Sequence, residues 1–327
     1  MEHPLLRALV GPWAWRPAVL MVLLPLTTIY LVGWVRLQRR GATRLASKWR
    51  LAAYGTGMLT LAASLMSPID SLGGQLFFMH MIQHKLTIMV AAPLIWLGNP
   101  FPIGVWGLPR QGRQALTSIF ADSAPVRPAL AAATQPFVAW LLFVFVYIGW
   151  HDPGMYNLAL THGRVHDLQH ITFFLTAMLF WWHVVGAAPR LHKTVSPWVA
   201  ILMLMAAIPF NAIAGFVIAN NESVIYTYYQ SVPRIWGFSV MQDQSVGGVI
   251  MWIPGSEMLF QAAAAVLAVM FWRDRKKRRA ENLPEALPLG ALDVADDALI
   301  APGLEHRLRH QQWREMAAQR THHTGTT

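Results

Sequence analysis

The stretch GGQLFFMHMIQHKLTIMVAAPLIWL, residues 73–97, decides the class of fold. It has the length that an α-helix needs to cross the hydrocarbon core of a bilayer, roughly 20 apolar residues, and Lys85 is its one charged residue. Six further stretches have the same character, near residues 17–35, 49–67, 130–150, 166–187, 197–219 and 246–272. The sequence therefore predicts an all-α polytopic membrane protein with seven transmembrane helices.

Composition agrees with a lipid environment, because 55% of the residues are hydrophobic and only 13% are charged. The net charge of +10 does not indicate a nucleic-acid partner, since the basic residues are spread between apolar segments and gather on no single face. They lie instead in every second connection between the apolar segments. The first connection has Arg36, Arg39, Arg40, Arg44, Lys48 and Arg50, the third has Arg110, Arg113 and Arg127, the fifth has Arg190 and Lys193, and the tail begins with RDRKKRR at 273–279. Lysine and arginine concentrate on the cytoplasmic side, so we expect the N-terminus outside and the C-terminus in the cytoplasm.

The expected domain organisation is a membrane domain over residues 1–272 and a basic cytoplasmic tail over residues 273–327. The basic run closes the last apolar segment, and a Pro/Ala/Asp-rich stretch follows it. We expect the tail to be partly disordered, with a short helix around residues 303–320.

Histidine is the residue type that carries chemistry here, because the chain has no cysteine and any transition metal must be bound by imidazole, thioether, amide or carboxylate groups. Six histidines are predicted to reach one depth near the outer face; besides His162 they are His80 and His84, His151, and His166 and His170, the five candidate ligands. His80 and His84 are spaced i,i+4, as are His166 and His170, so each pair projects from one helix face and its imidazoles can share an ion. We predict a metal site made by these five residues.

A single histidine in a membrane helix is ordinarily a hydrogen-bonding partner for a neighbouring helix, but two spaced pairs at one depth favour a metal. Imidazole suits copper and zinc, and thioether favours Cu(I). We expect two or three of these residues to bind the ion at once. Residues expected to hydrogen-bond the ligands or to replace one of them are His162, Met81, Gln83, Asp70, Asp152, Gln169, Asp243 and Gln244.

An intramembrane ion pair is also predicted. Lys85 and Glu257 fall at similar depths in the third and seventh apolar segments, and each charge alone would be costly in hydrocarbon. Gly247 and Gly248 begin the seventh segment with small residues that permit close helix approach. We expect Lys85 and Glu257 to neutralise each other below the histidines.

Four ordered motifs carry a family resemblance: SPIDSLGGQLFFMHMIQH at 67–84, WHDPGMYNLALTHGRVHDLQH at 150–170, FWW at 180–182 and DQSVGGVIMWIP at 243–254. Together they resemble the CtaG-like family of integral membrane proteins that assemble haem-copper cytochrome c oxidases. The resemblance implies seven membrane spans in the bacterial inner membrane, a non-enzymatic role in delivering or inserting copper, and oxidase subunits or other copper-handling proteins as partners. It also points to His80, His84, His151, His166 and His170.

Two positions depart from the family pattern. Gln169 stands where an HxxEH motif would have glutamate, and His183 stands where another residue type is usual. The residues alone leave two other classes open. One is a membrane metalloenzyme, either a zinc hydrolase or a copper oxidase, and the other is a haem-binding electron carrier with His84 and His170 as axial ligands.

Overall fold

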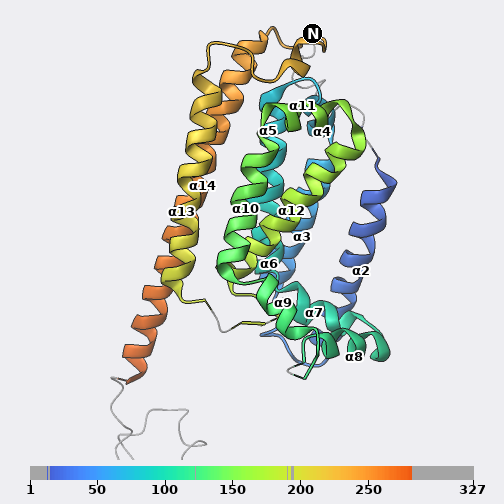
Figure 1. The fold of residues 1–327 in the computed structure, drawn as a ribbon. Helices are drawn as coiled ribbons and strands as arrows, with labels where there is room; N and C mark the ends of the chain where they lie inside the picture. The colour runs from blue at the N-terminus through green and yellow to red at the C-terminus, as the bar shows by residue number, and fades with distance from the viewer. Residues whose placement is uncertain (1–12, 14, 122, 190, 193–194, 282–327) are drawn as a thin grey trace, which may run out of the picture. The chain divides into compact units, whose positions relative to one another are not determined.

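The computed structural model describes residues 13, 15–121, 123–189, 191–192 and 195–281. Over these residues the regular structure is entirely helical (Figure 1). The chain divides into two compact units, Met1–Met270 and Phe271–Thr327. The all-α prediction is confirmed for the described part, whereas the helix expected around residues 303–320 lies outside it.

The longest helices follow the predicted apolar segments. They are α2 (Pro17–Arg39), α3 (Lys48–Met66), α12 (Gly163–Val185), α13 (Pro197–Asn220) and α14 (Val240–Glu281). Helix α14 continues through the basic run at 273–279 instead of ending near residue 272. In the second unit, Lys276 Nζ lies 5.5 Å from the ring centroid of Trp272.

Four of these helices, α2, α12, α13 and α14, are long and apolar enough to cross a membrane. Two bent helix pairs raise the number to six: Phe77–Leu97 with Pro100–Gly107, bent by 63°, and Arg127–Ala133 with Pro136–Trp150, bent by 51°. The remaining predicted span, residues 49–67, corresponds to α3, whose first turn contains Lys48 and Arg50 and which is not among the six. This number of long apolar helices indicates a membrane protein.

The segment predicted as one helix over 73–97 is divided. A short helix, α4 (Pro68–Gly73), precedes α5 (Phe77–Lys85), and a π-helix over Leu86–Ala91 joins α5 to α6 (Ala92–Leu97). The chain turns at Gly74 and Gln75, so the membrane helix begins at Phe77 and not at residue 73. The segment predicted over 130–150 is likewise divided into α9 (Arg127–Ala133) and α10 (Pro136–Trp150), because Pro136 cannot continue α9.

Short helices lie at the two ends of the first unit (Figure 1). Helices α4 and α11 (Pro153–Thr161) are at the end drawn uppermost, which we call the α4–α11 end. Helices α7 (Pro100–Gly107), α8 (Arg110–Ile119) and α9 are at the opposite end, the α7–α8 end. A 3₁₀ turn, η2 (Thr227–Gln230), lies between α13 and α14 in the chain.

Small residues allow the close packing of the helices. A Cβ atom on Gly248 would overlap the backbone of Ala219, and one on Gly215 would overlap the backbone of Trp252. Helices α13 and α14 therefore cross almost backbone to backbone at Gly215 and Gly248, as the glycines at the start of the seventh segment predict. Helix α12 packs against α10, α6 and the π-helix, and α3 packs against α6.

Candidate metal centre

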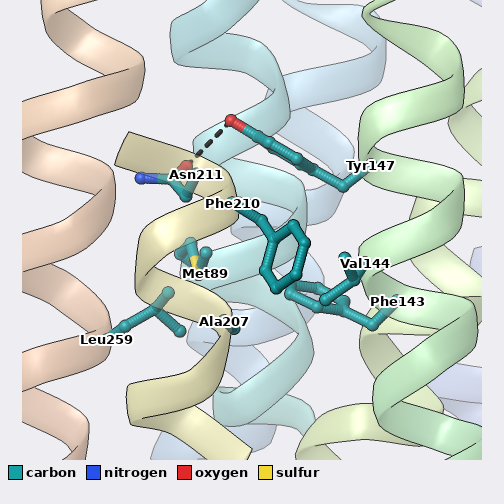
Figure 2. A pocket seen from close by; sticks show the side chains of 8 residues that line it. All are labelled: Met89, Phe143, Val144, Tyr147, Ala207, Phe210, Asn211 and Leu259. Atoms are coloured by element: carbon teal, nitrogen blue, oxygen red, sulfur yellow. Dashed lines mark hydrogen bonds between the residues drawn. The ribbon is translucent and has the colours of Figure 1, made fainter. Parts of the chain in front are cut away.

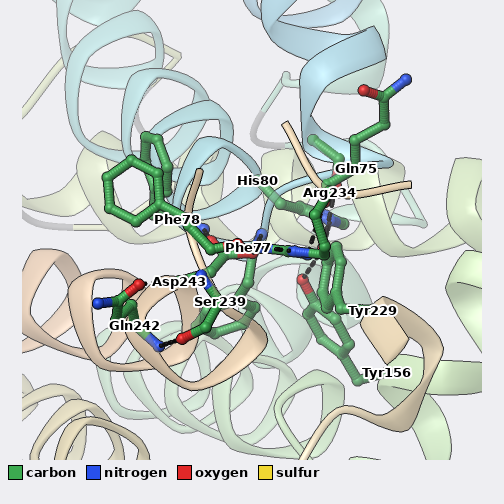
Figure 3. A network of polar contacts seen from close by, with 12 residues as sticks. Gln75, Phe77, Phe78, His80, Tyr156, Tyr229, Arg234, Ser239, Gln242 and Asp243 are labelled. Atoms are coloured by element: carbon green, nitrogen blue, oxygen red, sulfur yellow. Dashed lines mark hydrogen bonds and ion pairs between the residues drawn. The ribbon is translucent and has the colours of Figure 1, made fainter. Parts of the chain in front are cut away.

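The start of α5 is fixed by a carboxylate from a distant helix (Figure 3). The backbone N–H groups of Phe77 and Phe78 donate to the two oxygens of Asp243, each at 3.0 Å. Arg234 donates to the same carboxylate at 2.9 Å, and Asp243 is fully buried. A negative charge at a helix N-terminus satisfies free N–H groups and complements the helix dipole. This contact sets the position of α5 and hence of His80, one turn later.

The five predicted histidines come together at the α4–α11 end. Helix α5 contributes His80 and His84, the C-terminus of α10 contributes His151, and the first turns of α12 contribute His166 and His170. Ring centroids are 4.4 Å apart for His80–His84 and for His166–His170, 5.3 Å for His80–His166, 5.1 Å for His84–His170 and 6.5 Å for His84–His151. We call these five residues the histidine cluster.

Three members of the cluster form a metal-ligand arrangement. One ring nitrogen from each of His80, His166 and His170 lies within 4.8 Å of the others. Nε2 of His166 is 3.2 Å from Nε2 of His170. Two nitrogens on one tetrahedral ion, each about 2.0–2.1 Å from it, lie roughly 3.3 Å apart. These three residues, the histidine triad, therefore fit a single ion with small side-chain movements.

Polar atoms without hydrogen-bond partners concentrate in the same place. Among the described residues, eight buried side-chain nitrogen or oxygen atoms have no partner, and Trp140 Nε1 is the one outside the cluster region. The other seven are His80 Nε2, both ring nitrogens of His84, His151 Nε2, His170 Nδ1 and both amide atoms of Gln169. Leaving such a group unpaired costs about 1–3 kcal/mol. The histidines of the cluster fit a metal, because an ion uses the lone pairs that the protein leaves unused.

Comparison with known proteins identifies the family. A family model described as cytochrome c oxidase caa3 assembly factor matches residues 28–274. The chain belongs to the cytochrome c oxidase caa3 assembly factor family. This confirms the resemblance seen in the sequence motifs.

Curated relatives of this chain come from mycobacteria. An uncharacterized protein of Mycobacterium leprae is 30% identical over 233 residues, which cover 68% of this chain and 34% of the relative. Uncharacterized proteins of Mycobacterium bovis and Mycobacterium tuberculosis are each 27% identical over 284 residues, 83% of this chain and 40% of the relative. The chain thus spans less than half the length of these relatives. No solved structure matches it.

Hydrogen bonds orient two histidines of the cluster, His80 and His151, so that the lone pair of Nε2 is free. His151 Nδ1 lies 2.6 Å from the Tyr147 carbonyl oxygen, which can only accept, so Nδ1 carries the hydrogen. Tyr229 donates its hydroxyl to the Gly73 carbonyl at 2.9 Å, so its oxygen can accept from His80 Nδ1 at 3.4 Å. Burial raises the pKa of the Tyr229 hydroxyl well above its ordinary value and keeps it protonated. Such contacts fix which nitrogen of a histidine can bind a metal.

The residues predicted to hydrogen-bond the ligands have other partners. Gln83 donates to Ser64 O and to the Asp70 carboxylate, and Asp152 accepts from the N–H groups at the start of α11. Gln244 accepts from Ile225 N–H and donates to Ser223 O. With Asp243 at the start of α5, these side chains hold backbone segments in place and make no hydrogen bond to the cluster. The oxygen atoms found against the ring nitrogens of His151 and His80 are instead the Tyr147 carbonyl and the Tyr229 hydroxyl.

The other residues predicted near the ligands lie in different environments. Met81 is buried in the apolar core, His162 Nδ1 lies 3.0 Å from Thr161 Oγ1 on the surface, and Gln169 is fully buried with an unpaired amide. His183 lies far along α12 from His170 and contacts the Thr134 carbonyl oxygen through Nε2 at 2.7 Å. His183 is therefore separate from the cluster, as its sequence position predicts.

The predicted Lys85–Glu257 ion pair does not form. Lys85 Nζ donates to Asn211 Oδ1 at 2.7 Å, whereas Glu257 is on an exposed face of α14 and accepts from Gln261 at 3.0 Å. Asn211 Oδ1 also accepts from Tyr147, a bond drawn beside an apolar pocket in Figure 2. Gly255, and not Glu257, faces Lys85, since a Cβ atom there would overlap Nζ. Sequence depth identified the correct pair of helices but the wrong face of α14.

Proposed function

We propose that this chain binds copper through the histidine cluster and delivers or inserts it during maturation of haem-copper oxidases. The observation that carries the proposal is the concentration of unpaired buried imidazole nitrogens at the cluster. Membership in an oxidase assembly family supplies the process, and oxidase subunits or other copper-handling proteins are the expected partners.

Copper is the favoured metal because the ligand set is imidazole without thiolate. The chain has no cysteine, and imidazole nitrogen suits copper, with zinc as the competing ion. The histidine triad is the primary site in this proposal. His84 and His151, whose rings are 6.5 Å apart, continue from the triad and form the hand-off route. Few ligands at each position keep the ion exchangeable, as delivery requires.

The proposed topology has seven spans, an outer N-terminus and a cytoplasmic C-terminus in the bacterial inner membrane. Its support is a group of basic residues at the end opposite the cluster. Arg36 and Arg40 lie at the end of α2, and Arg110 and Arg113 lie on α8, all at the α7–α8 end. The cluster lies at the opposite end, which the positive-inside rule assigns to the outer face.

The geometry disfavours the two other classes. Imidazoles on opposite faces of a haem iron would have ring centroids roughly 6 Å apart with the macrocycle between them, whereas those of His84 and His170 are 5.1 Å apart. A hydrolase needs a general base beside the metal, but residue 169, next to His170 of the triad, is an amide and not a carboxylate. A non-enzymatic role therefore fits best.

The test combines metal binding with oxidase maturation. Detergent-purified protein is titrated with Cu(I) against the chelator bicinchoninate, using wild type, His170→Ala and His84→Ala, with His183→Ala as a control on the same helix. We expect one tightly bound Cu(I) in wild type and in the control, and greatly weakened binding in His170→Ala. In a deletion strain the oxidase should lose copper. Normal oxidase copper after deletion would exclude the assembly role, and absence of bound Cu(I) would exclude direct carriage.

A further inference from the structure

Arg16 connects three elements at the α4–α11 end. It directly precedes α2, and its guanidinium binds Asp70 of α4 at 2.8 Å and Asp167 of α12 at 2.9 Å. Asp167 directly follows His166, a member of the histidine triad. Arg16 also lies outside residues 28–274, which the family model matches.

The bridge residue Asp167 is the chain neighbour of the most exposed member of the triad. His80 and His170 are buried, whereas His166 is half-buried. The charged side chains that act on His166 electrostatically are Asp70, Arg16 and Asp167, and Arg16 acts on His170 as well. A cation that enters from solvent therefore meets His166 first, in the field of these three groups.

The two carboxylates are not held equally. The Asp70 side chain is 5% exposed, and its second oxygen accepts from Gln83 at 2.8 Å, so it is fixed from both sides. The Asp167 side chain is 59% exposed and Arg16 is 32% exposed. Asp70 is therefore the fixed end of the bridge, and Arg16 and Asp167 form its solvent-exposed part.

We propose that Arg16 controls the rate at which a metal cation reaches the histidine triad. Its positive charge repels the incoming ion and neutralises the two carboxylates that would otherwise attract it. When Arg16 moves aside, Asp70 and Asp167 face the ion and guide it to His166. No bond is broken other than the ion pairs, which are exchanged for contacts with the cation. This inference rests on the proposed metal-binding function, and it names Arg16 as the residue that limits the rate of metal binding, which we call loading.

The first test measures loading kinetics. Transfer of Cu(I) from its bicinchoninate complex is followed by stopped flow in wild type, Arg16→Ala, Arg16→Lys and Asp167→Asn. Removing a like charge from the path of an ion should raise the association rate about tenfold in Arg16→Ala. Arg16→Lys should stay near wild type, and Asp167→Asn should load more slowly. A rate in Arg16→Ala equal to or below that of wild type would overturn the inference.

Arg36→Ala is the matched control. Arg36 is on the same helix, and its guanidinium donates to the carbonyl groups of Trp106, Gly107 and Leu108 at the other end of α2. Its loss loosens α2 without touching the triad, so the loading rate should not change. Faster loading in Arg36→Ala as well would assign the effect to helix mobility and would also overturn the inference.

A second readout does not depend on copper. Diethyl pyrocarbonate modifies accessible histidines, and the modification of His166 in metal-free protein can be quantified by peptide mass spectrometry. We expect several-fold faster modification of His166 in Arg16→Ala than in wild type or Arg36→Ala. Equal rates would overturn the inference even if Cu(I) binds. If wild type binds no Cu(I), the proposed function fails, and this measurement alone decides whether Arg16 controls access.

Discussion

Nε2 of His166 lies 3.2 Å from Nε2 of His170 on the next turn of α12. One of the two nitrogens must carry a hydrogen when no metal is present, and a bound ion would replace that hydrogen. Because these residues and His80 form the triad, His170→Ala should weaken Cu(I) binding at least about 100-fold, more than loss of an outer hydrogen bond does. His84→Ala should weaken binding less but slow transfer to an acceptor. Chelator competition and transfer kinetics measure the two effects separately.

Gln169→Leu should stabilise the metal-free protein. Both amide atoms of Gln169 are buried without partners, and each unpaired group costs about 1–3 kcal/mol. A leucine of similar size removes that cost, so the free energy of unfolding in mixed detergent should rise. Thr161→Val on the surface is a control for general effects of added apolar area. Destabilisation by Gln169→Leu would show that the amide has a partner in the folded protein.

Asp243→Asn should weaken copper binding although Asp243 touches no histidine. The substitution leaves Arg234 without its charged partner and weakens two hydrogen bonds at the start of α5. Hydrogen bonds to charged groups contribute about 1.5–3 kcal/mol, so we expect lower stability together with a displaced His80. Asp152→Asn, at the start of α11, is the matched control and should leave Cu(I) affinity unchanged. Wild-type affinity in Asp243→Asn would contradict a positioning role.

Gly248→Ala should destabilise the contact between α13 and α14. The added methyl group would overlap the backbone of Ala219, and overpacking of this kind costs about 1–3 kcal/mol. Gly149→Ala provides the comparison, because no atom lies within 4 Å of the position of its Cβ. Thermal unfolding of the two purified variants measures the difference. Equal stability would mean that α13 and α14 can separate without cost.

Much of the site was predictable because it depends on local spacing. The i,i+4 pairs His80–His84 and His166–His170 share a face in any helix, and apolar length with basic connections aligned the depths of α5, α10 and α12. The carbonyl that orients His151 was also accessible to this reasoning, since Tyr147 precedes it by one helical turn.

Long-range polar contacts were not predictable in the same way. Tyr229 reaches His80 from a 3₁₀ turn, and Asn211 reaches Lys85 from another helix, so neither spacing nor composition identifies them. The error over Glu257 has the same origin. Depth along α14 follows from residue number, but which face meets Lys85 depends on how helices cross, and the small residue Gly255 decides that contact.

The π-helix over Leu86–Ala91 has a consequence for the phase of the helix that contains it. Each turn with i→i+5 hydrogen bonds accommodates one extra residue, and one residue corresponds to a rotation of roughly 100° about the axis of an α-helix. The residues before this segment can therefore face the metal-binding side while Ala92 and Ile95 after it remain buried. In one continuous span, the π-helix therefore rotates the face of α5 relative to the face of α6, so that the two halves contact different neighbouring helices.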